Sequence, residues 1–222
     1  METSIYHTLE KLGVTSKQSR VLFNNRTRDI NNLNVWKDSV SGVIYIDEFY
    51  TGNQTYIDGS YIDDEVFELK TGKPDFERER DAQRRLKSNL KFVAGKRVGD
   101  FGCGSGDFLK LAKPYCENVL GIELQQNYVD LLNSHGISCT NDLANVENKS
   151  LDIVVSFHVL EHLPNPLDTL SELITKIVSD GQILIEVPHA NDFLLSTICC
   201  DDFKQFTLWS QHMVLHTRET LR

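Results

Sequence analysis

Glycines and acidic residues are concentrated in one short stretch, RVGDFGCGSGDFLKLAKPYCENVLGIEL, residues 97–124. Gly102, Gly104 and Gly106 occupy alternate positions between an apolar run and a helix-like segment. Glycine allows a sharp bend and lets a ligand approach the backbone without a Cβ in the way. The N-terminus of the following helix offers unpaired N–H groups. The loop is therefore suited to binding a carboxylate or a phosphate.

Two acids beside this loop narrow the class of ligand. Asp100 ends the first apolar run, and Glu123 closes the next one, where a carboxylate can accept both hydroxyls of a ribose. The glycine spacing is G-x-G-x-G, whereas a dinucleotide loop has G-x-G-x-x-G. Asp100 would repel a pyrophosphate but could pair with an ammonium group. The pattern favours a nucleoside that carries an amino acid over a dinucleotide.

Histidines supply candidates for acid–base chemistry. The stretch HVLEHL places His158, Glu161 and His162 within one turn, where two imidazoles and a carboxylate could share a face. Histidine can accept a proton near neutral pH without an unusual environment. The alternative, in which Glu161 and His162 only organise a loop and satisfy backbone groups, stays open.

The elements that must position these residues follow an alternating pattern from residue 96 onward. Short apolar runs predict strands, and the segments between them predict helices. The strands are expected at 97–101, 118–122, 151–157 and 182–187, and the helices at 107–113, 125–135 and 166–178. Strands that alternate with helices indicate βαβ units, and uniformly apolar strands are typical of a sheet covered on both faces. We therefore predict an α/β fold with a doubly wound parallel sheet.

The N-terminal third of the chain has a different composition. A β-branched and aromatic run at 41–50, with Asn-, Asp- and Gly-rich turns around it, predicts a small β-rich appendage. A helix is expected at 73–92, with Pro74 near its start, where a missing N–H costs little. We place the boundary here, with an appendage at 1–72 and the ligand-binding domain at 73–222.

Composition and charge argue against several classes of protein. No run approaches the ~18 apolar residues that would span a bilayer, and the N-terminus lacks a signal-peptide pattern. Five cysteines without a C-x-x-C pair indicate a reduced, cytoplasmic protein with neither a disulfide framework nor a zinc knuckle. Residues 99–222 carry 7 Lys and Arg against 17 Asp and Glu, which argues against nucleic acid. The basic run at 78–87 contains interleaved acids and is interpreted as a solvated helix face.

Several motifs in order resemble those of class I S-adenosylmethionine-dependent methyltransferases. VGDFGCGSG is similar to their first motif, VLGIEL to their second, and NDLANV lies where the family places an acid near the adenine. LDIVVSFHVLEHLPNP and GQILIEVP resemble the fourth- and fifth-strand motifs of small-molecule members, including ubiquinone-biosynthesis-type enzymes. The resemblance covers residues 90–190, and several motifs in order are stronger evidence for a family than a single glycine loop. It implies a Rossmann-like core and S-adenosyl-L-methionine as the cofactor.

The resemblance also implies roles for individual residues. Asp100 and the loop glycines would hold the methionine part of the cofactor, and Glu123 the ribose. Leu124 would pack on the adenine, and His158 would border the sulfonium. The expected cofactor-binding set is Asp100, Phe101, Gly102, Cys103, Gly104, Gly106, Glu123, Leu124, Asp142, Leu143, Phe157 and His158. A surface turn remains the alternative role for Asp142.

The last segment, FTLWSQHMVLHTRETLR, resembles a stretch of sugar C-methyltransferases. Trp209 stands in its aromatic position, Gln211 replaces its acid, and His212 keeps its imidazole. The expected catalytic residues are therefore His212, His162 and Glu161, with a structural role for His212 as the alternative. Those sugar enzymes often begin with a zinc-binding module. VWKDSVSGVIYID resembles one whose cysteines have been replaced, so we expect a degenerate zinc-ribbon-like module and no metal.

Three functions remain open at this point. The first is transfer of a methyl group to a small polar acceptor, possible acceptors being a sugar and a quinone-like precursor; this is the one we expect. The second is a non-catalytic partner subunit that binds S-adenosylmethionine. The third, a nicotinamide-dependent oxidoreductase, is disfavoured by the glycine spacing and Asp100. We expect no nucleic-acid or membrane partner and leave a homodimer open. The family fold normally continues with two strands after TRETLR, so these C-terminal strands are expected to be missing.

Overall fold

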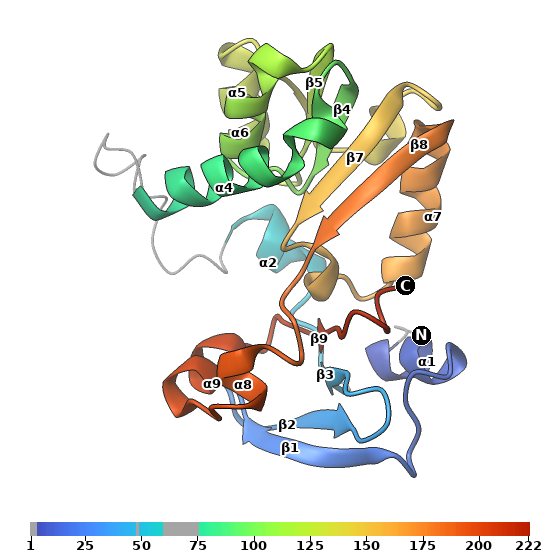
Figure 1. Cartoon of the computed structure of the whole chain (residues 1–222), viewed down its shortest axis with the longest axis vertical. Helices are drawn as coiled ribbons and strands as arrows, with labels where there is room; N and C mark the ends of the chain where they lie inside the picture. Colours follow the sequence, from blue (N-terminus) through green and yellow to red (C-terminus); the bar gives the residue numbers. More distant parts are fainter. Residues whose placement is uncertain (1–3, 48, 60–75) are drawn as a thin grey trace. The chain divides into compact units, whose positions relative to one another are not determined.

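A computed structural model of the chain describes residues 4–47, 49–59 and 76–222 (Figure 1). These residues fall into two compact units. The parallel-sheet unit contains the described parts of Gly52–Phe157 and Thr169–Ile185. The small-sheet unit joins the N-terminal segment up to Thr51 with His158–Asp168 and Glu186–Arg222. The boundary expected between residues 72 and 73 lies outside the described residues.

Five strands form the sheet of the parallel-sheet unit, in the order β6-β5-β4-β7-β8. β4 pairs in parallel with β5 and β7, and β5 pairs in parallel with β6. β8 runs in the same direction as β7 (Figure 1). The strands are β4 (Arg97–Phe101), β5 (Asn118–Ile122), β6 (Ser138–Thr140), β7 (Leu151–Phe157) and β8 (Ile177–Glu186). The predicted doubly wound parallel sheet is confirmed, with β6 as an additional strand. β4, β5 and β7 match the predicted ranges, whereas the strand expected at 182–187 begins earlier, at Ile177, and ends at Glu186.

Helices cover both faces of this sheet, as a doubly wound fold requires. On one side lie α4 (Phe76–Val93), α5 (Asp107–Ala112) and α6 (Gln126–Ser134), and on the other lies α7 (Pro166–Lys176) (Figure 1). Successive side chains of a strand point to opposite faces. On β7, Ile153 and Val155 therefore pack with the first set of helices, while Val154 packs with α7. The unit is completed by α2 (Asn53–Ile57), η1 (Lys113–Tyr115) and η2 (Leu143–Asn145).

The helix predictions hold with small differences at the ends. α5 and α6 begin and end within one residue of the predicted ranges. α7 ends at Lys176 rather than at 178, because β8 already begins at Ile177. The first residues of the helix expected at 73–92 lie outside the described residues, and α4 continues to Val93.

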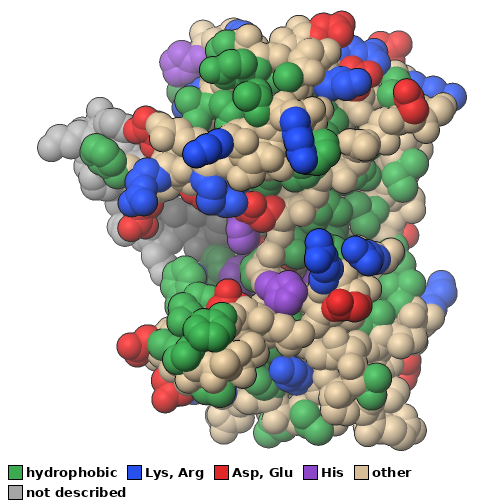
Figure 2. All heavy atoms as spheres, viewed as in Figure 1, with side chains coloured by type: hydrophobic (Ala, Val, Ile, Leu, Met, Phe, Trp, Pro, Cys, Tyr) green, Lys and Arg blue, Asp and Glu red, His purple; other side chains and the backbone are tan. Residues whose placement is uncertain are grey.

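Lys and Arg side chains are spread over the face of α4 that is in view (Figure 2).

The small-sheet unit contains an antiparallel sheet in the order β1-β2-β3-β9. The strands are β1 (Arg20–Arg26), β2 (Asn31–Asp38), β3 (Ile44–Ile46) and β9 (Val214–Leu215), and the helices are α1 (Ile5–Lys11), η3 (Leu160–His162), α8 (Phe193–Ser196) and α9 (Asp201–Thr207). The strand expected at 41–50 is wrong in extent. Gly42 has a φ of +75° and forms the turn after β2, so only three residues remain in β3.

Asp38 ties together two turns of the small-sheet unit. Its side chain is only 1% exposed. The carboxylate accepts hydrogen bonds from the Thr15 hydroxyl at 3.0 Å, from the Ser19 hydroxyl, and from the N–H groups of Val40 and Ser41 at 2.9 and 2.8 Å. In the turn before β1, Ser16 and Ser19 are spaced S-x-x-S. In the turn at the end of β2, Asp38 and Ser41 are spaced D-x-x-S. These spacings are those of zinc-knuckle cysteines, and the zinc-ribbon-like module stays a prediction.

The described residues contain no helix that is both long and apolar enough to cross a membrane. All five cysteines, which lie within the described ranges, are free thiols.

The hydrogen bonds to Asp38 predict an acid-sensitive contribution to stability. Burial alone would raise the pKa of Asp38, but the hydrogen bonds from Ser19, Ser41, Val40 and Thr15 outweigh it and lower the pKa to about 2. Since the folded-state pKa is depressed, this contribution is present above about pH 4 and is lost as the pH falls toward about 2. The two hydroxyls donate to one carboxylate oxygen and the two N–H groups donate to the other, so an amide can accept from only one of these pairs. We therefore predict that Asp38→Asn lowers the free energy of unfolding by about 1–3 kcal/mol at neutral pH.

Urea denaturation followed by near-UV circular dichroism measures this effect. Exposed Asp130→Asn in the other unit is the matched control and should unfold like the wild type. Equal midpoints for Asp38→Asn and wild type at pH 7 would show that the network adds nothing to stability.

Candidate functional site

The glycine loop joins the end of β4 to the start of α5. Gly102, Gly104 and Gly106 have φ values of +75°, +52° and +76°, a backbone region that other L-residues rarely adopt. A Cβ on Gly106 would lie 2.4 Å from a side-chain carbon of Leu132 on α6, whereas a Cβ on Gly104 would meet nothing within 4 Å. Gly106 is therefore needed for packing, and Gly104 leaves open space beside the loop.

A pocket lies beside this loop, entirely within the parallel-sheet unit. It is lined by residues of α4, of the loop and of α5, by Asp100 of β4, and by the last residue of β7. The lining residues are Arg78, Asp81, Ala82, Arg85, Asp100, Gly102, Cys103, Gly104, Ser105, Asp107, Phe108 and Phe157. Five of the expected cofactor-binding residues line it, namely Asp100, Gly102, Cys103, Gly104 and Phe157.

Asp100 is a buried acid with one unused oxygen. Its side chain is 2% exposed, and its Oδ1 has no hydrogen-bond partner. Burial raises the pKa of Asp100 to about 7; Arg85 acts against this rise and Glu123 adds to it. A buried polar atom without a partner is costly. A cationic group bound in the pocket would satisfy this oxygen and favour the ionised carboxylate.

Glu123 holds the glycine loop on the sheet. Its Oε2 accepts the Gly104 N–H at 2.8 Å, and its Oε1 accepts the Gln125 N–H at 3.0 Å. Burial raises the pKa of Glu123, and these backbone N–H groups limit the rise. An ionised carboxylate has about four lone-pair sites. The two bonds therefore leave acceptor capacity for hydroxyl groups such as those of a ribose.

The remaining expected cofactor residues do not line the pocket. Phe101 and Leu143 pack against the apolar cluster on the α7 side of the sheet. Leu124 is 51% exposed. Asp142 caps η2 by accepting the Ala144 N–H at 2.8 Å. His158 belongs to the small-sheet unit.

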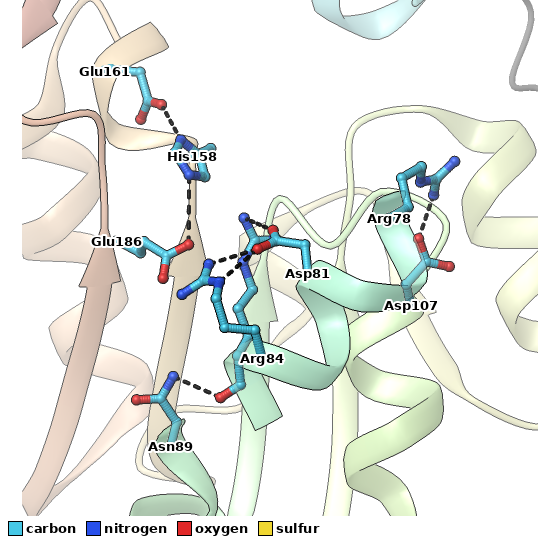
Figure 3. Close-up of polar contacts among 9 residues, drawn as sticks. Arg78, Asp81, Arg84, Asn89, Asp107, His158, Glu161 and Glu186 are labelled. Carbon is cyan, nitrogen blue, oxygen red and sulfur yellow. Dashed lines mark hydrogen bonds and ion pairs between the residues drawn. The ribbon is translucent and has the colours of Figure 1, made fainter. Parts of the chain in front are cut away.

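The interpretation of 78–87 as a solvated helix face is wrong for two arginines. Arg78 and Arg85 lie seven residues apart on α4, so they share one face, and both line the pocket. Arg78 binds Asp107 at 2.6 Å (Figure 3). Arg85 binds Asp81 at 2.8 Å, and its guanidinium lies 4.8 Å from the centre of the Phe157 ring. The helical spacing of the two arginines was a signal that could have identified them.

His158 follows β7 directly and has an unusual backbone. Its φ is +58°, which is rare for a residue with a side chain. Its imidazole lies between two carboxylates, with Nδ1 3.1 Å from Glu161 Oε1 and Nε2 3.5 Å from Glu186 Oε1 (Figure 3). Non-glycine residues in this region often mark functional sites.

The three expected catalytic residues lie together in the small-sheet unit. One side-chain atom from each of Glu161, His162 and His212 lies within 4.8 Å of the others, and the two imidazole centres are 5.1 Å apart. His162 Nδ1 lies 2.8 Å from the Gln211 carbonyl, and His212 Nδ1 lies 2.8 Å from the Thr207 carbonyl. Carbonyl oxygens only accept, so each Nδ1 carries a proton, and Nε2 is the basic atom of each neutral ring.

Burial and charge set the protonation of this cluster. Burial lowers the pKa of His162, and the nearby Glu161 carboxylate limits the decrease. Burial, together with the charge of His162, lowers the pKa of His212 to about 4. Burial alone would raise the pKa of Glu161, but the His158 hydrogen bond and the charges of both neighbouring histidines bring it below its usual value.

The cluster therefore combines neutral imidazoles with an ionised carboxylate near pH 7. Glu161 is 0% exposed, and its Oε2 has no hydrogen-bond partner, as is also true of the buried Gln211 Oε1. Such a group can bind a hydroxyl and take its proton. Imidazole and carboxylate are also donors that divalent metal ions accept.

Comparison with known proteins decides the family. The model of a family described as "Methyltransferase domain" matches residues 77–222. The chain belongs to this methyltransferase family. The resemblance to class I S-adenosylmethionine-dependent methyltransferases is thereby confirmed, and S-adenosylmethionine is the family's cofactor. This family assignment argues against the alternative of a nicotinamide-dependent oxidoreductase.

Similar proteins agree with the family. Ubiquinone biosynthesis O-methyltransferase from Ralstonia nicotianae is 29% identical over 118 residues, which cover 48% of this chain and 50% of that protein. The enzyme of the same name from Cupriavidus pinatubonensis is 27% identical over 109 residues, 45% of this chain and 44% of that protein. The chain thus spans about half the length of these curated relatives.

A solved structure extends the likeness to the fold. The S-adenosylmethionine-dependent methyltransferase from Archaeoglobus fulgidus has a TM-score of 0.54 and 27% identity, and the match covers 70% of this chain and 69% of that one. The residues of the pocket fit the family cofactor, because the unpartnered Asp100 oxygen suits the cofactor's ammonium group.

The pKa of Asp100 predicts a pH-dependent affinity for the cofactor product. S-adenosylhomocysteine carries the same ammonium group, which would pair with Asp100 only when the carboxyl is ionised. With a pKa of about 7, the ionised fraction and hence the affinity should rise about tenfold between pH 6 and pH 8. Asp100→Asn should bind more weakly and with little pH dependence. Isothermal titration calorimetry at several pH values measures both effects.

Asp130→Asn, on the exposed surface of α6, is the control and should keep the wild-type pH profile. A flat profile for the wild-type protein would contradict the pairing of Asp100 with the ammonium group.

Proposed function

We propose that this chain transfers the methyl group of S-adenosylmethionine to a hydroxyl of a small, quinone-like phenolic acceptor. The observation that carries this proposal is the Glu161–His162–His212 cluster, which combines basic imidazole nitrogens with a buried carboxylate. The similar proteins are ubiquinone biosynthesis O-methyltransferases, and their name supports a hydroxyl as the acceptor group.

The cofactor would be held by residues of the parallel-sheet unit. Asp100 would pair with the ammonium group, and Arg85 or Arg78 would attract the carboxylate of the same amino-acid moiety, since all three line the pocket. Glu123 would accept the ribose hydroxyls with its remaining lone pairs. When bound, the cofactor supplies a methyl group already made electrophilic by the sulfonium. The protein therefore mainly has to orient the acceptor and remove its proton.

His162 is the proposed general base. Its Nε2 would accept the proton of the acceptor hydroxyl, while Nδ1–H stays bonded to the Gln211 carbonyl. The Glu161 carboxylate would stabilise the imidazolium that forms. Glu161 opposes the decrease in the pKa of His162, whereas burial and the charge of His162 lower the pKa of His212 to about 4, which makes His212 a weak base. His212 Nε2 would orient the acceptor hydroxyl by accepting a hydrogen bond.

Several of the residues that this proposal combines are close together in the sequence. Phe157 lines the pocket, and the next residue is His158, which precedes Glu161 and His162 in η3. A short stretch of chain therefore connects the proposed cofactor-binding residues with the proposed acid–base residues. No observation favours the alternative of a non-catalytic partner subunit. A sugar acceptor remains less supported, because Gln211 stands where the sugar enzymes have an acid.

Replacement of the base should separate chemistry from binding. We predict that His162→Gln lowers kcat by about 10²–10⁴-fold and leaves the affinity for S-adenosylhomocysteine unchanged. The assay follows transfer of an isotope-labelled methyl group to catechol and protocatechuate. Exposed His7→Gln is the matched control and should keep wild-type kcat.

The pH dependence adds a second readout. Because the pKa of His162 is lowered, the neutral base should already dominate at pH 7. At saturating S-adenosylmethionine, where the titration of Asp100 no longer limits cofactor binding, kcat/KM for the acceptor should fall only as the pH drops below about 6.5. Full activity of His162→Gln would refute the assignment of the base. Loss of activity on treatment with EDTA, restored by a divalent metal, would instead make the cluster a metal site.

A further inference from the structure

Two thiols lie close together beside the cofactor pocket. Cys103 lies in the glycine loop and Cys139 on β6, with their sulfur atoms 4.0 Å apart. Both side chains are partly exposed, and Cys103 lines the pocket. A Cβ on Gly121 of β5 would lie 2.8 Å from the Cys103 sulfur and 2.9 Å from the Cys139 sulfur. The missing side chain of Gly121 thus leaves one space that both sulfurs share.

We propose that Cys103 and Cys139 form a reversible disulfide on exposure to hydrogen peroxide, and that this modification weakens cofactor binding. The second half of the proposal rests on the proposed cofactor pocket. A disulfide requires an S–S distance of about 2.0 Å, so the sulfurs must approach each other by about 2 Å. Side-chain rotation and a small movement of the loop or of β6 can supply this approach.

Cys139 is the thiol suited to react first. The Cys103 S–H hydrogen bond lowers the pKa of Cys139, whereas the same contact and burial raise the pKa of Cys103. The Cys139 thiolate attacks one peroxide oxygen, the O–O bond breaks, and the other oxygen leaves as water once it has taken up a proton. This step leaves a sulfenic acid on Cys139.

The second step closes the disulfide. The Cys103 sulfur attacks the sulfenic sulfur of Cys139, and the S–O bond breaks as the S–S bond forms. The hydroxyl leaves as a second water with the proton of Cys103. Two thiols are thereby oxidised to one disulfide, and one peroxide is reduced to two waters. A dithiol such as dithiothreitol reverses the change by thiol–disulfide exchange.

The backbone around Cys103 explains the effect on the cofactor. The Gly102 N–H donates to the Ile122 carbonyl at 2.8 Å, and the Gly104 N–H donates to Glu123 at 2.8 Å. The Cys103 carbonyl accepts the Gly106 N–H at 2.9 Å. Cys103 lies at the centre of these bonds, so pulling its sulfur toward β6 shifts the loop backbone. The shift alters the open space at Gly104 and the position of Glu123, which together shape the cofactor site.

The experiment uses the full chain with and without hydrogen peroxide. Intact-mass measurement should show the loss of two hydrogens, and peptide mapping should recover the peptides of Cys103 and Cys139 linked together. Calorimetric titration with S-adenosylhomocysteine should show a Kd at least about tenfold weaker after oxidation, which corresponds to 1.4 kcal/mol. Dithiothreitol should restore the original Kd.

Two serine variants locate the effect. Cys139→Ser should bind S-adenosylhomocysteine like the reduced wild type and lose the response to peroxide. Cys116→Ser, at a partly buried thiol elsewhere in the same unit, should keep the response. Absence of the linked peptides, or a linked protein with an unchanged Kd, would overturn the inference. Failure of the reduced wild type to bind S-adenosylhomocysteine would instead count against the proposed function as well, and the peptide map would still show whether the disulfide forms.

Discussion

The site depends on one constraint, the burial of the Asp100 carboxyl group at the end of β4 with an oxygen that no protein group satisfies. A charge in such a place is unfavourable unless a cation joins it. The glycine loop and the Glu123 carboxylate keep this space open while satisfying each other, since the Gly104 N–H bonds to Glu123. The protein thus maintains a strained electrostatic state that the family cofactor, with its ammonium group, would relieve.

In the histidine cluster, too, burial and hydrogen bonding together decide which side chains are charged. Burial keeps His162 and His212 neutral, while the hydrogen bond from His158 helps keep Glu161 ionised. Each Nδ1–H is bonded to a backbone carbonyl, which fixes the ring orientation and the tautomer. A base fixed in this way needs little reorganisation when it accepts a proton, which is the usual advantage of a preorganised site.

The parallel sheet was predictable from sequence because its central strands are continuous apolar runs between turns. β6 escaped prediction since its three residues, Ser138–Thr140, contain no apolar run. The strand expected at 41–50 was too long, because the turn at Gly42 limits β3 to Ile44–Ile46.

The candidate site was predictable only in part. The glycine loop and Asp100 follow from residue types and spacing, and the pocket contains them. Arg78 and Arg85 were missed because interleaved charges usually mark a solvated helix. The contact between His162 and His212 depends on tertiary structure, and only a family resemblance drew attention to His212.

The contact between Gly106 and Leu132 has an evolutionary consequence. The leucine is fully buried on α6 and does not line the pocket, yet its side chain fills the space that a Cβ at position 106 would need. Substitution of Leu132 by a bulkier residue would displace the glycine loop. A mutational screen for cofactor binding would then record this core substitution as a binding defect. Compensation would be hard to find at position 106, where glycine is already the smallest residue. The two positions are therefore expected to constrain each other across homologous sequences.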